Sequence, residues 1–486
     1  MKETVKSLLI GICALVALVL WLSLQPKQPA DWSQKGVGEP LFPTFKDVDA
    51  MGGIDIVRPT YGIKTEDAKK EEKPDGTASI HVERDENDWV IASASRFPAS
   101  TPDRMTMVVA PLLTLSVLSE VTEIESSDEA KRSAFLRQCR LLDPTRASMS
   151  DLADAGIRVT VQGTGGETFA DFIVGAIPEE SSAVRDIRYL RLVGDDRVYT
   201  VDFSAEAVEA SGEGKALPYV DRLSTDPLDW IDRDLLRISR WNIAKMEIFR
   251  SSIEEGEKFV PKEFLQVAQD PERSLGRVWE LTERVTFDAD GHGLPVEITG
   301  ENRFPDNDPL NVAVDKITHL SIAGFQRKPD AFAEISLQNR PDRELDAIKD
   351  LIRPFGLFLA DHDPFRPEGV DPILVADGGK VRLTMTDGTV LTLLFGNATD
   401  DGKRFLVVHA SFDPDFFPAP EPLVPSENAD EKERERITDE NRLRKSEYDL
   451  SVAEGEKKAR LSDRRFAPWL YLINESDYRE IFSENP

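Results

Sequence analysis

The hydrophobic residues of this chain follow three patterns, and the first is an apolar run at residues 8–24 that only Gly11, Cys13 and Ser23 interrupt. Lys2 and Lys6 precede this run. At ~1.5 Å per residue, about 18 helical residues nearly cross the ~30 Å hydrocarbon core of a membrane. The run therefore predicts either a membrane-spanning helix or a secretory signal.

The sequence around this run favours a retained span over a cleaved signal. A cleavage site needs small residues just beyond the run, whereas the chain continues Trp21-Leu-Ser-Leu-Gln-Pro-Lys27. The positive-inside rule keeps the two lysines in the cytoplasm. We expect a cytoplasmic N-terminus at 1–6, a transmembrane signal anchor at 7–24 and a tether at 25–44. The protein would then be a single-pass protein of the inner (cytoplasmic) membrane, with the bulk of the chain extracytoplasmic.

The second pattern is alternation of apolar and polar residues, which predicts β-strands. Residues 157–161, a glycine-rich turn and residues 169–175 read as one antiparallel hairpin. Residues 381–385, the Asp387-Gly388 turn and residues 390–396 read as a second. A further apolar strand follows each hairpin, at 198–203 and at 405–409. The two regions therefore look like copies of one design.

The third pattern has helical spacing and also occurs twice. Arg96-Phe-Pro98 stands ahead of a helix-like stretch at 105–118, and Arg303-Phe-Pro305 stands ahead of another at 312–322. Residues 47–58 and 242–250 match as opening strands, and Trp230 and Trp469 stand near the two ends. The fold class predicted is α+β, with an N-terminal transmembrane helix followed by two tandem α+β repeat units with antiparallel hairpins. The units are placed at 45–240 and 241–486.

Residues 426–465 form a separate charged segment, rich in Glu, Lys and Arg and free of proline. Pairs such as Asp430 with Arg434 and Glu440 with Arg444 suit an exposed helix inserted in the second unit. The alternative is a coiled-coil docking arm, but apolar heptads are not sustained along the segment.

Composition narrows the classes of partner. The formal net charge of −29, without any basic stripe, argues against nucleic acid as a partner. The only two cysteines are Cys13, in the predicted span, and Cys139, so no disulfide is expected within the exported part. Cys139 lies in a helix-like segment and is expected to be a buried core residue. We expect the same of Trp89, Trp230 and Trp469.

No motif for catalysis, cofactor binding or metal binding stands out. The five histidines show no metal-ligand spacing, and the nucleophile-elbow, phosphate-loop and dinucleotide motifs are absent. Asp288-Ala-Asp-Gly-His-Gly293 fails as a calcium loop and reads as a hairpin turn. His362, between two aspartates, reads as part of a polar turn. We therefore assign no catalytic, cofactor-binding or metal-binding residue and expect no cofactor.

Several short motifs, taken together, resemble a known bacterial family. They are Pro40-Leu-Phe-Pro43, Trp89 ahead of Arg96-Phe-Pro-Ala99, Trp230 with Asp232-Arg-Asp-Leu-Leu236, and Arg465-Phe-Ala-Pro-Trp469. In this order and behind an N-terminal span, they make the chain similar to the family called domain of unknown function 4340. The resemblance implies a membrane-anchored envelope protein linked to auxiliary components of gliding-motility-type ABC transporters. It implies no catalytic residue.

The sequence leads to one functional hypothesis with two alternatives. The hypothesis is a membrane-anchored, non-catalytic accessory or interaction protein of an ABC-type transport complex, whose partners are the membrane and the permease or auxiliary subunits. The first alternative is an envelope hydrolase that acts on glycan or peptidoglycan through carboxylates the sequence does not single out. The second is a scaffold that self-associates through the charged helix.

Overall fold

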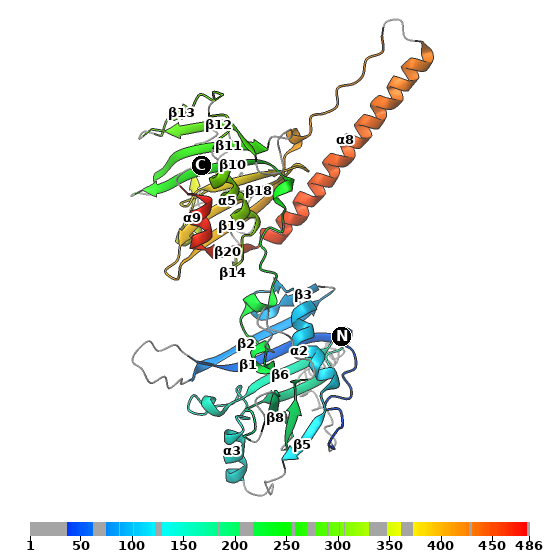
Figure 1. Cartoon of the computed structure of the whole chain (residues 1–486), viewed down its shortest axis with the longest axis vertical. Coiled ribbons are helices and arrows are strands. Elements are labelled where there is room, and N and C mark those ends of the chain that lie inside the picture. The colour runs from blue at the N-terminus through cyan, green and yellow to red at the C-terminus, as the bar shows by residue number, and fades with distance from the viewer. Residues whose placement is uncertain are drawn as a thin grey trace, which may run out of the picture. The chain divides into compact units, whose positions relative to one another are not determined.

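In the computed structural model the chain forms two compact units, Met1–Ile231 and Asp232–Pro486 (Figure 1). The structure describes residues 36–483 except 62–73, 87, 101, 122–128, 180, 182–184, 196, 205–216, 255–257, 270–277, 289–290, 301, 306, 330–347, 361–372 and 427–429. The predicted span at 7–24 and His362 lie outside these residues. Within the described part of the chain, no helix is both long enough and apolar enough to cross a membrane.

Unit 1 is built on a nine-stranded antiparallel sheet with the strand order β4-β3-β2-β1-β6-β7-β8-β9-β5. In chain order the strands are β1 (Met51–Tyr61), β2 (Pro74–Asp85), β3 (Asp88–Ile91), β4 (Phe97–Pro98), β5 (Val117–Val121), β6 (Ile157–Gly163), β7 (Thr168–Val174), β8 (Ile187–Leu192) and β9 (Val198–Asp202). The helices are α2 (Pro102–Thr114), α3 (Glu129–Gln138) and α4 (Tyr219–Arg222). The predicted hairpin at 157–175 is confirmed as β6 and β7.

The packed core of unit 1 begins within the predicted tether. Leu41 and Phe42 are buried, and the Leu41 amide donates to the Leu115 carbonyl oxygen at 2.8 Å. The rings of Phe42 and Phe172 lie 5.3 Å apart between centroids. Part of the segment 36–44 therefore belongs to the folded unit 1, because its apolar side chains are covered by the sheet.

Unit 2 is built on a second nine-stranded antiparallel sheet, ordered β13-β12-β11-β10-β17-β18-β19-β20-β14. Its strands are β10 (Ile243–Glu254), β11 (Lys258–Gln269), β12 (Trp279–Phe287), β13 (Gly293–Pro295), β14 (Gly324–Arg327), β17 (Lys380–Met385), β18 (Thr389–Ala398), β19 (Lys403–Phe412) and β20 (Trp469–Asn474). The hairpin β15 (Leu357–Ala360) and β16 (Ile373–Ala376) stands apart from this sheet. The helices are α5 (Asn307–Thr318), α8 (Glu431–Phe466) and α9 (Glu475–Ile481). The predicted hairpin at 381–396 is confirmed as β17 and β18.

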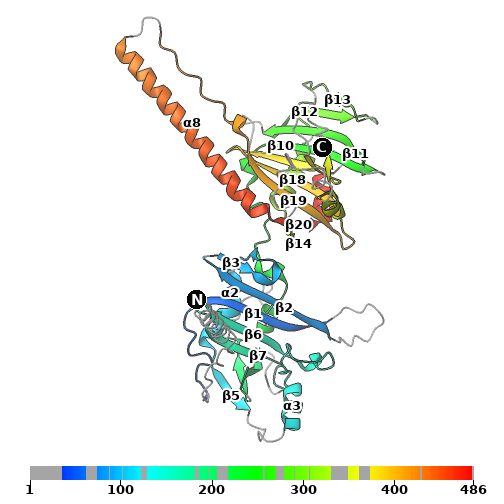
Figure 2. The same cartoon turned by 180° about the vertical axis from the view of Figure 1, so that it is seen from behind.

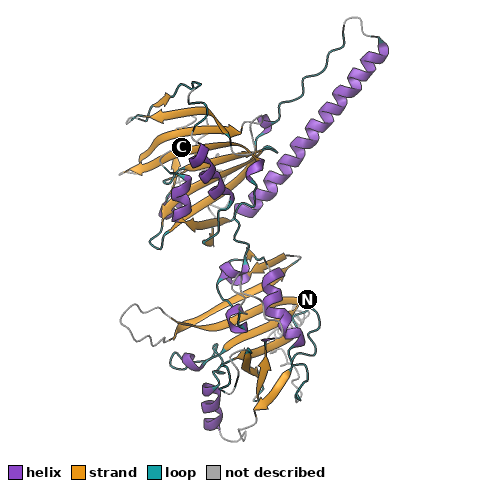
Figure 3. Cartoon of the chain, viewed as in Figure 1, coloured by secondary structure: helices purple, strands orange, loops and turns teal. Residues whose placement is uncertain are grey.

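The two sheets have the same topology. Replacing each strand of unit 1 by its counterpart in chain order, with β15 and β16 left out as an insertion, converts one strand order into the other. α2 and α5 stand at the same point of the chain order, between β4 and β5 and between β13 and β14. Both units combine strands with helices (Figure 3). The α+β class with antiparallel sheets is thus confirmed.

A β-bulge that occurs in both units shows which residues of the two sheets correspond. In unit 1 the pairing of β1 with β6 shifts between Met51 and Gly53, and in unit 2 the pairing of β10 with β17 shifts between Ile243 and Lys245. A bulge adds one residue to one strand only, so it marks a defined position in each sheet. Counting from it, Ile56 with its partner Val159 corresponds to Ile248 with its partner Val381.

The predicted match of the third strands, 198–203 with 405–409, is wrong. The strand that follows the hairpin in unit 1 is β8, so β8 corresponds to β19 and β9 to β20. The mismatch arises because α8 separates β19 from β20, whereas a short loop joins β8 to β9. Trp469 opens β20, and Trp230 lies in a 3₁₀ helix after β9, so the two tryptophans are not equivalent.

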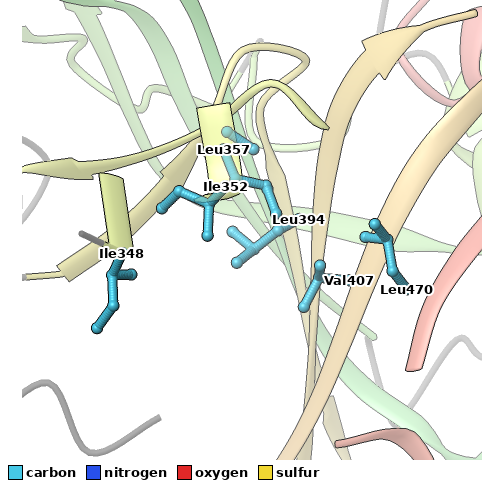
Figure 4. Close-up of a cluster of buried hydrophobic side chains, with 7 residues drawn as sticks. Ile348, Ile352, Leu357, Leu394, Val407 and Leu470 are labelled. Atoms are coloured by element: carbon cyan, nitrogen blue, oxygen red, sulfur yellow. The ribbon is translucent and has the colours of Figure 1, made fainter. Parts of the chain in front are cut away.

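Two insertions distinguish unit 2. The β15–β16 hairpin packs on the sheet through a buried apolar cluster, drawn in Figure 4, of Ile348, Ile352, Leu357, Ala376, Leu394, Val407 and Leu470. The second insertion is α8, which confirms the predicted charged helix. It extends beyond the edge of its sheet in both views (Figures 1 and 2). Asp430 caps its first turn by accepting a hydrogen bond from the Glu433 amide at 2.8 Å.

Other local predictions also hold. Asp288, Gly291 and His292 lie between the antiparallel strands β12 and β13, and the Asp288 carboxylate accepts from the His292 amide at 2.8 Å. Cys139, Trp230 and Trp469 are buried. The same prediction does not hold for Trp89, which is only half-buried because β3 lies next to the edge strand β4.

Candidate functional site

A pocket of about 190 Å³ in unit 1 gathers three arginines, Arg58, Arg140 and Arg188. Arg58 is on β1, Arg188 is on β8, and Arg140 follows α3, so residues far apart in sequence meet here. Such a cluster is notable in a chain with a net charge of −29. Guanidinium groups favour planar anions such as carboxylates, which they bind in a bidentate manner.

The sheet and the helix ends hold these arginines in place. Arg58 lies on the same face of β1 as buried Ile56, and its Nη1 donates to the Leu223 carbonyl oxygen at 3.2 Å. The Nε of Arg188 donates to Asp186 Oδ1 at 2.6 Å. Arg140 adopts a left-handed backbone conformation (φ 53°) just past α3, and no ion pair of its side chain occurs among the described residues.

Glycines bring the Arg140 segment close to the sheet. A Cβ at Gly156 would come within 2.7 Å of Ile173 Cγ2, Val174 O and Arg140 O. A Cβ at Gly175 would collide with the carbonyl oxygens of Cys139 and Arg140. Only glycine permits this approach, so these two positions set the depth of the pocket.

Unit 2 has arginines at two of the same positions. Counting from the shared bulge, Arg250 on β10 corresponds to Arg58 on β1. Leu190 of β8 pairs with Val174, and Leu406 of β19 pairs with Phe395. Two residues before each leucine stand Arg188 and Arg404, which are therefore equivalent.

In unit 2 the C-terminal helix α9 occupies this place. Arg404 binds Glu475 with both ends of its guanidinium, from Nε to Oε2 at 2.7 Å and from Nη2 to Oε1 at 3.2 Å. Its Cζ lies 3.7 Å from the centroid of the Tyr478 ring. Arg250 Nη2 donates to the Ser483 carbonyl oxygen at 2.9 Å. Both arginines are thus used to hold the end of the chain.

The floor beneath α9 also corresponds to the pocket of unit 1. The Tyr478 hydroxyl donates to the Gly378 carbonyl oxygen at 3.0 Å, and the Phe482 ring lies 5.2 Å from that of Phe395. Gly378 and Phe395 are equivalent to Gly156 and Val174, which line the pocket. We call the surface under α9 the α9 seat. The arginine pocket is therefore the counterpart of the α9 seat in unit 1.

Unit 1 covers its version of the seat only in part. The helix α4 is a single turn, and the Tyr219 hydroxyl ties it to α2 by donating to the Val108 carbonyl oxygen at 2.9 Å. The bond from Arg58 to the Leu223 carbonyl oxygen, just after α4, parallels the bond from Arg250 to Ser483. The pocket lies where α4 leaves the remaining surface open.

A second group of ionisable residues lies where α8 meets its sheet. His409 Nδ1 and Asp463 Oδ1 are 3.8 Å apart, and the Ala410 amide donates to the same oxygen at 3.1 Å. Burial lowers the pKa of His409 against the opposing effect of Asp463. Burial opposes ionisation of Asp463, but the nearby His409 ring and the hydrogen bond from the Ala410 amide lower its pKa overall. A neutral histidine beside an ionised aspartate is the resulting state.

Lys328 belongs to the same buried group. Its side chain is almost fully buried, and burial lowers its pKa to about 8, with Asp463 acting in the opposite direction. An adjoining groove of about 320 Å³ runs between β19 and α8 and includes Asp463. Because Asp463 also binds the backbone of β19, this group anchors α8.

Among the described residues, no carboxyl group has a clearly raised pKa. A general acid requires a carboxyl group with a raised pKa. Among the described residues, every carboxyl group with a clear shift has a lowered pKa, namely Asp151, Asp195, Asp202, Asp387, Asp401 and Asp463. Likewise, no group of three or more potential metal ligands occurs in the part of the chain that the structure describes.

The sequence did not single out the arginine pocket, although it contained one signal of it. The matched opening strands at 47–58 and 242–250 both end in arginine. Arg140 and Arg188 join Arg58 only through the sheet order, which the sequence pattern does not contain.

Comparison with known proteins adds no relative to this picture. The chain matches no protein-family model, and neither a curated protein nor a solved structure is similar to it. The resemblance to the domain of unknown function 4340 family therefore stays a prediction.

Proposed function

We propose that the protein is a non-catalytic interaction protein whose first unit binds an anionic segment of a partner in the arginine pocket. The observation that carries this proposal is the equivalence of that pocket with the α9 seat. In unit 2 the same arginine positions hold a peptide segment with a carboxylate and aromatic rings. In unit 1, α4 covers part of the corresponding surface, and among the described residues the remaining part forms the pocket.

The size of the pocket supports a peptide ligand over a cofactor. Small-molecule sites usually enclose about 300–1,000 Å³, whereas this pocket has about 190 Å³. A volume of this order suits one or two side chains of a partner. Its arginines supply the charge-assisted hydrogen bonds that a carboxylate needs.

The overall charge of the chain affects which anionic partners can approach the pocket. A net charge of −29 repels polyanions at long range. Charges beyond ~8 Å are largely screened at physiological salt, so a bound segment meets mainly the guanidinium groups of the pocket, of which Arg188 is already paired with Asp186. We therefore expect selection of short acidic segments and exclusion of nucleic acid.

The location of the protein belongs to the same proposal. The apolar run at 7–24 supports a single-pass anchor with the folded units outside the cytoplasm. The family resemblance supports an ABC-type transport complex as the place of action. The partner segment would then belong to a permease or auxiliary subunit.

The proposal is tested by affinity purification of the full-length protein from detergent-solubilised membranes after gentle crosslinking. Arg140→Glu should remove a transporter subunit recovered with the wild type, because it reverses the most exposed charge of the pocket. Arg146→Glu makes the same charge change at a side chain that is 84 % exposed and outside the pocket, and should leave recovery unchanged. Equal loss in both variants, or no subunit recovered with the wild type, would contradict the proposal.

A further inference from the structure

We infer that the ligand of the arginine pocket is a short helix with a carboxylate in its first turn and aromatic residues three and seven positions later. This inference rests on the proposed function and specifies the chemical class of the partner segment. Its basis is α9, which occupies the equivalent seat in unit 2.

Two side chains of α9 and that of its C-cap residue, Phe482, carry the contacts with the seat and lie on one face. Glu475, Tyr478 and Phe482 are separated by three and four residues, which is the spacing of neighbours along a helix surface. Glu475 meets Arg404, Tyr478 meets both Arg404 and Gly378, and Phe482 meets Phe395. The α9 seat therefore binds one acidic side chain and two aromatic rings.

The pocket of unit 1 offers the matching groups. Arg188 stands at the place of Arg404, and Gly156 stands at the place of Gly378, whose carbonyl oxygen accepts from Tyr478. Val174 replaces the bulkier Phe395. Val174 lines the pocket together with Val220 of α4, so an aromatic ring of the ligand would lie against these two side chains.

The arginines of the pocket differ in whether they already have a carboxylate partner. Asp186 already accepts from the Nε of Arg188, as well as from the Tyr219 amide at 2.6 Å. Arg140 is exposed and has no ion pair among the described residues. We therefore assign the primary contact with the ligand carboxylate to Arg140, with Arg188 and Arg58 lining the wall.

The closest available probe is the chain's own C-terminal segment. A labelled peptide of residues 474–483, Asn-Glu-Ser-Asp-Tyr-Arg-Glu-Ile-Phe-Ser, is titrated into the full chain and followed by fluorescence anisotropy. We expect saturable binding that Arg140→Glu weakens at least tenfold and that Arg146→Glu leaves unchanged. Replacing Tyr478 by Ala or Glu475 by Gln within the peptide should each weaken binding by a similar factor.

A second set of variants shows which unit holds the peptide. If the peptide displaced α9 in unit 2, binding would respond to Arg404→Lys, whereas the inference predicts no effect of that change. Binding that is insensitive to Arg140→Glu, or absent altogether, would overturn the inference. It would also be overturned if binding appeared only after Glu206, Glu209 and Glu213 were changed to Gln, because a segment of the chain itself would then be the occupant.

The two proposals fail in different ways. If the peptide does not bind but a transporter subunit is still lost with Arg140→Glu, the pocket binds a partner of another chemistry. In that case the proposed function stands and the helical acid–aromatic ligand is rejected.

Discussion

Arg188 on β8 and Arg404 on β19 hold the same position in two sheets, but they meet their carboxylates in different ways. Arg404 binds Glu475, which comes from the helix α9, through two hydrogen bonds of 2.7 and 3.2 Å. Arg188 binds Asp186, two residues away on the same stretch of chain, through its Nε. One unit thus uses the position to hold its own C-terminal helix, whereas the other leaves part of the same surface open.

The Arg404–Glu475 pair should stabilise the end of unit 2. The side chains are only 11 % and 15 % exposed, so solvent screens their interaction weakly. We expect Glu475→Gln to lower the local stability of α9 and β19 by about 1–3 kcal/mol. Hydrogen–deuterium exchange resolves this change because it reports each segment separately, whereas a two-unit chain need not unfold in one step.

Glu480→Gln on the same helix is the matched control. Glu480 pairs with Lys316, but these side chains are 46 % and 36 % exposed. An exposed pair of this kind contributes about 0–1 kcal/mol. Equal exchange in the two variants would show that the seat does not hold α9 through its arginine.

Glu247 should be the most sensitive charged residue of the unit 2 sheet. It is fully buried on β10, with Lys245 Nζ at 3.3 Å and Arg382 Nη1 at 3.2 Å. Removing it leaves Lys245 and Arg382, which are 28 % and 23 % exposed, without their shared carboxylate, so Glu247→Leu should cost about 3–5 kcal/mol. Exchange rates of β10 and β17 measure the effect.

The double variant Glu247→Leu with Arg382→Leu tests the physical reason. If the cost comes from the unpaired guanidinium, the second change should restore part of the lost protection. If the double variant instead lost as much stability as the two single variants together, the unpaired guanidinium would not be the cause of the cost.

Lys328 should make the stability of unit 2 depend on alkaline pH. Burial lowers its pKa to about 8 in the folded chain, against about 10.4 for an unperturbed lysine. Between these values the unfolded chain binds more protons, so this residue makes stability rise with pH from about 8 to about 10.4. Lys328→Met removes the charge and should be more stable at pH 7, by an amount on the order of 1–3 kcal/mol.

The measurement compares exchange protection of wild type and Lys328→Met from pH 7 to pH 10. The advantage of the variant should shrink as the pH rises through the folded pKa. An advantage that stays constant over this range would mean that the lysine is neutral or well paired throughout.

Cys139 should be unreactive in the folded chain. Burial of the thiol raises its pKa to about 11, so little thiolate exists near neutral pH. In a Cys13→Ser background, we expect negligible labelling by a thiol reagent at pH 8 until denaturant is added. Rapid labelling without denaturant would show that the segment after α3, which also carries Arg140, opens readily.

The sequence predicted the hairpins because alternation with period two is a local property. The same period explains why it misjudged their register. The pattern aligns residue 157 with residue 381, whereas the strand pairing aligns Val159 with Val381. A shift of two residues keeps every side chain on its face, so only the bulge and the partner strands reveal it.

The candidate site could not be predicted from the sequence, for a different reason. Arg58, Arg140 and Arg188 come from separate elements, and no spacing rule connects them. Their proximity follows from the strand order and from the close approach that Gly156 and Gly175 permit. The correspondence of the pocket with the α9 seat requires both sheets to be known.

Photo-crosslinking at Tyr61 tests most directly whether the pocket binds a partner. Tyr61 lines the pocket and is 42 % exposed, so p-benzoylphenylalanine can replace it in the full-length protein in the cells that make it. We predict one adduct, joined to a partner segment that carries an acid and aromatic residues, and lost with Arg140→Glu. The same probe at Met149, exposed in unit 1 outside the pocket, should not form it. An adduct that persists with Arg140→Glu, or none at Tyr61, would contradict the proposal.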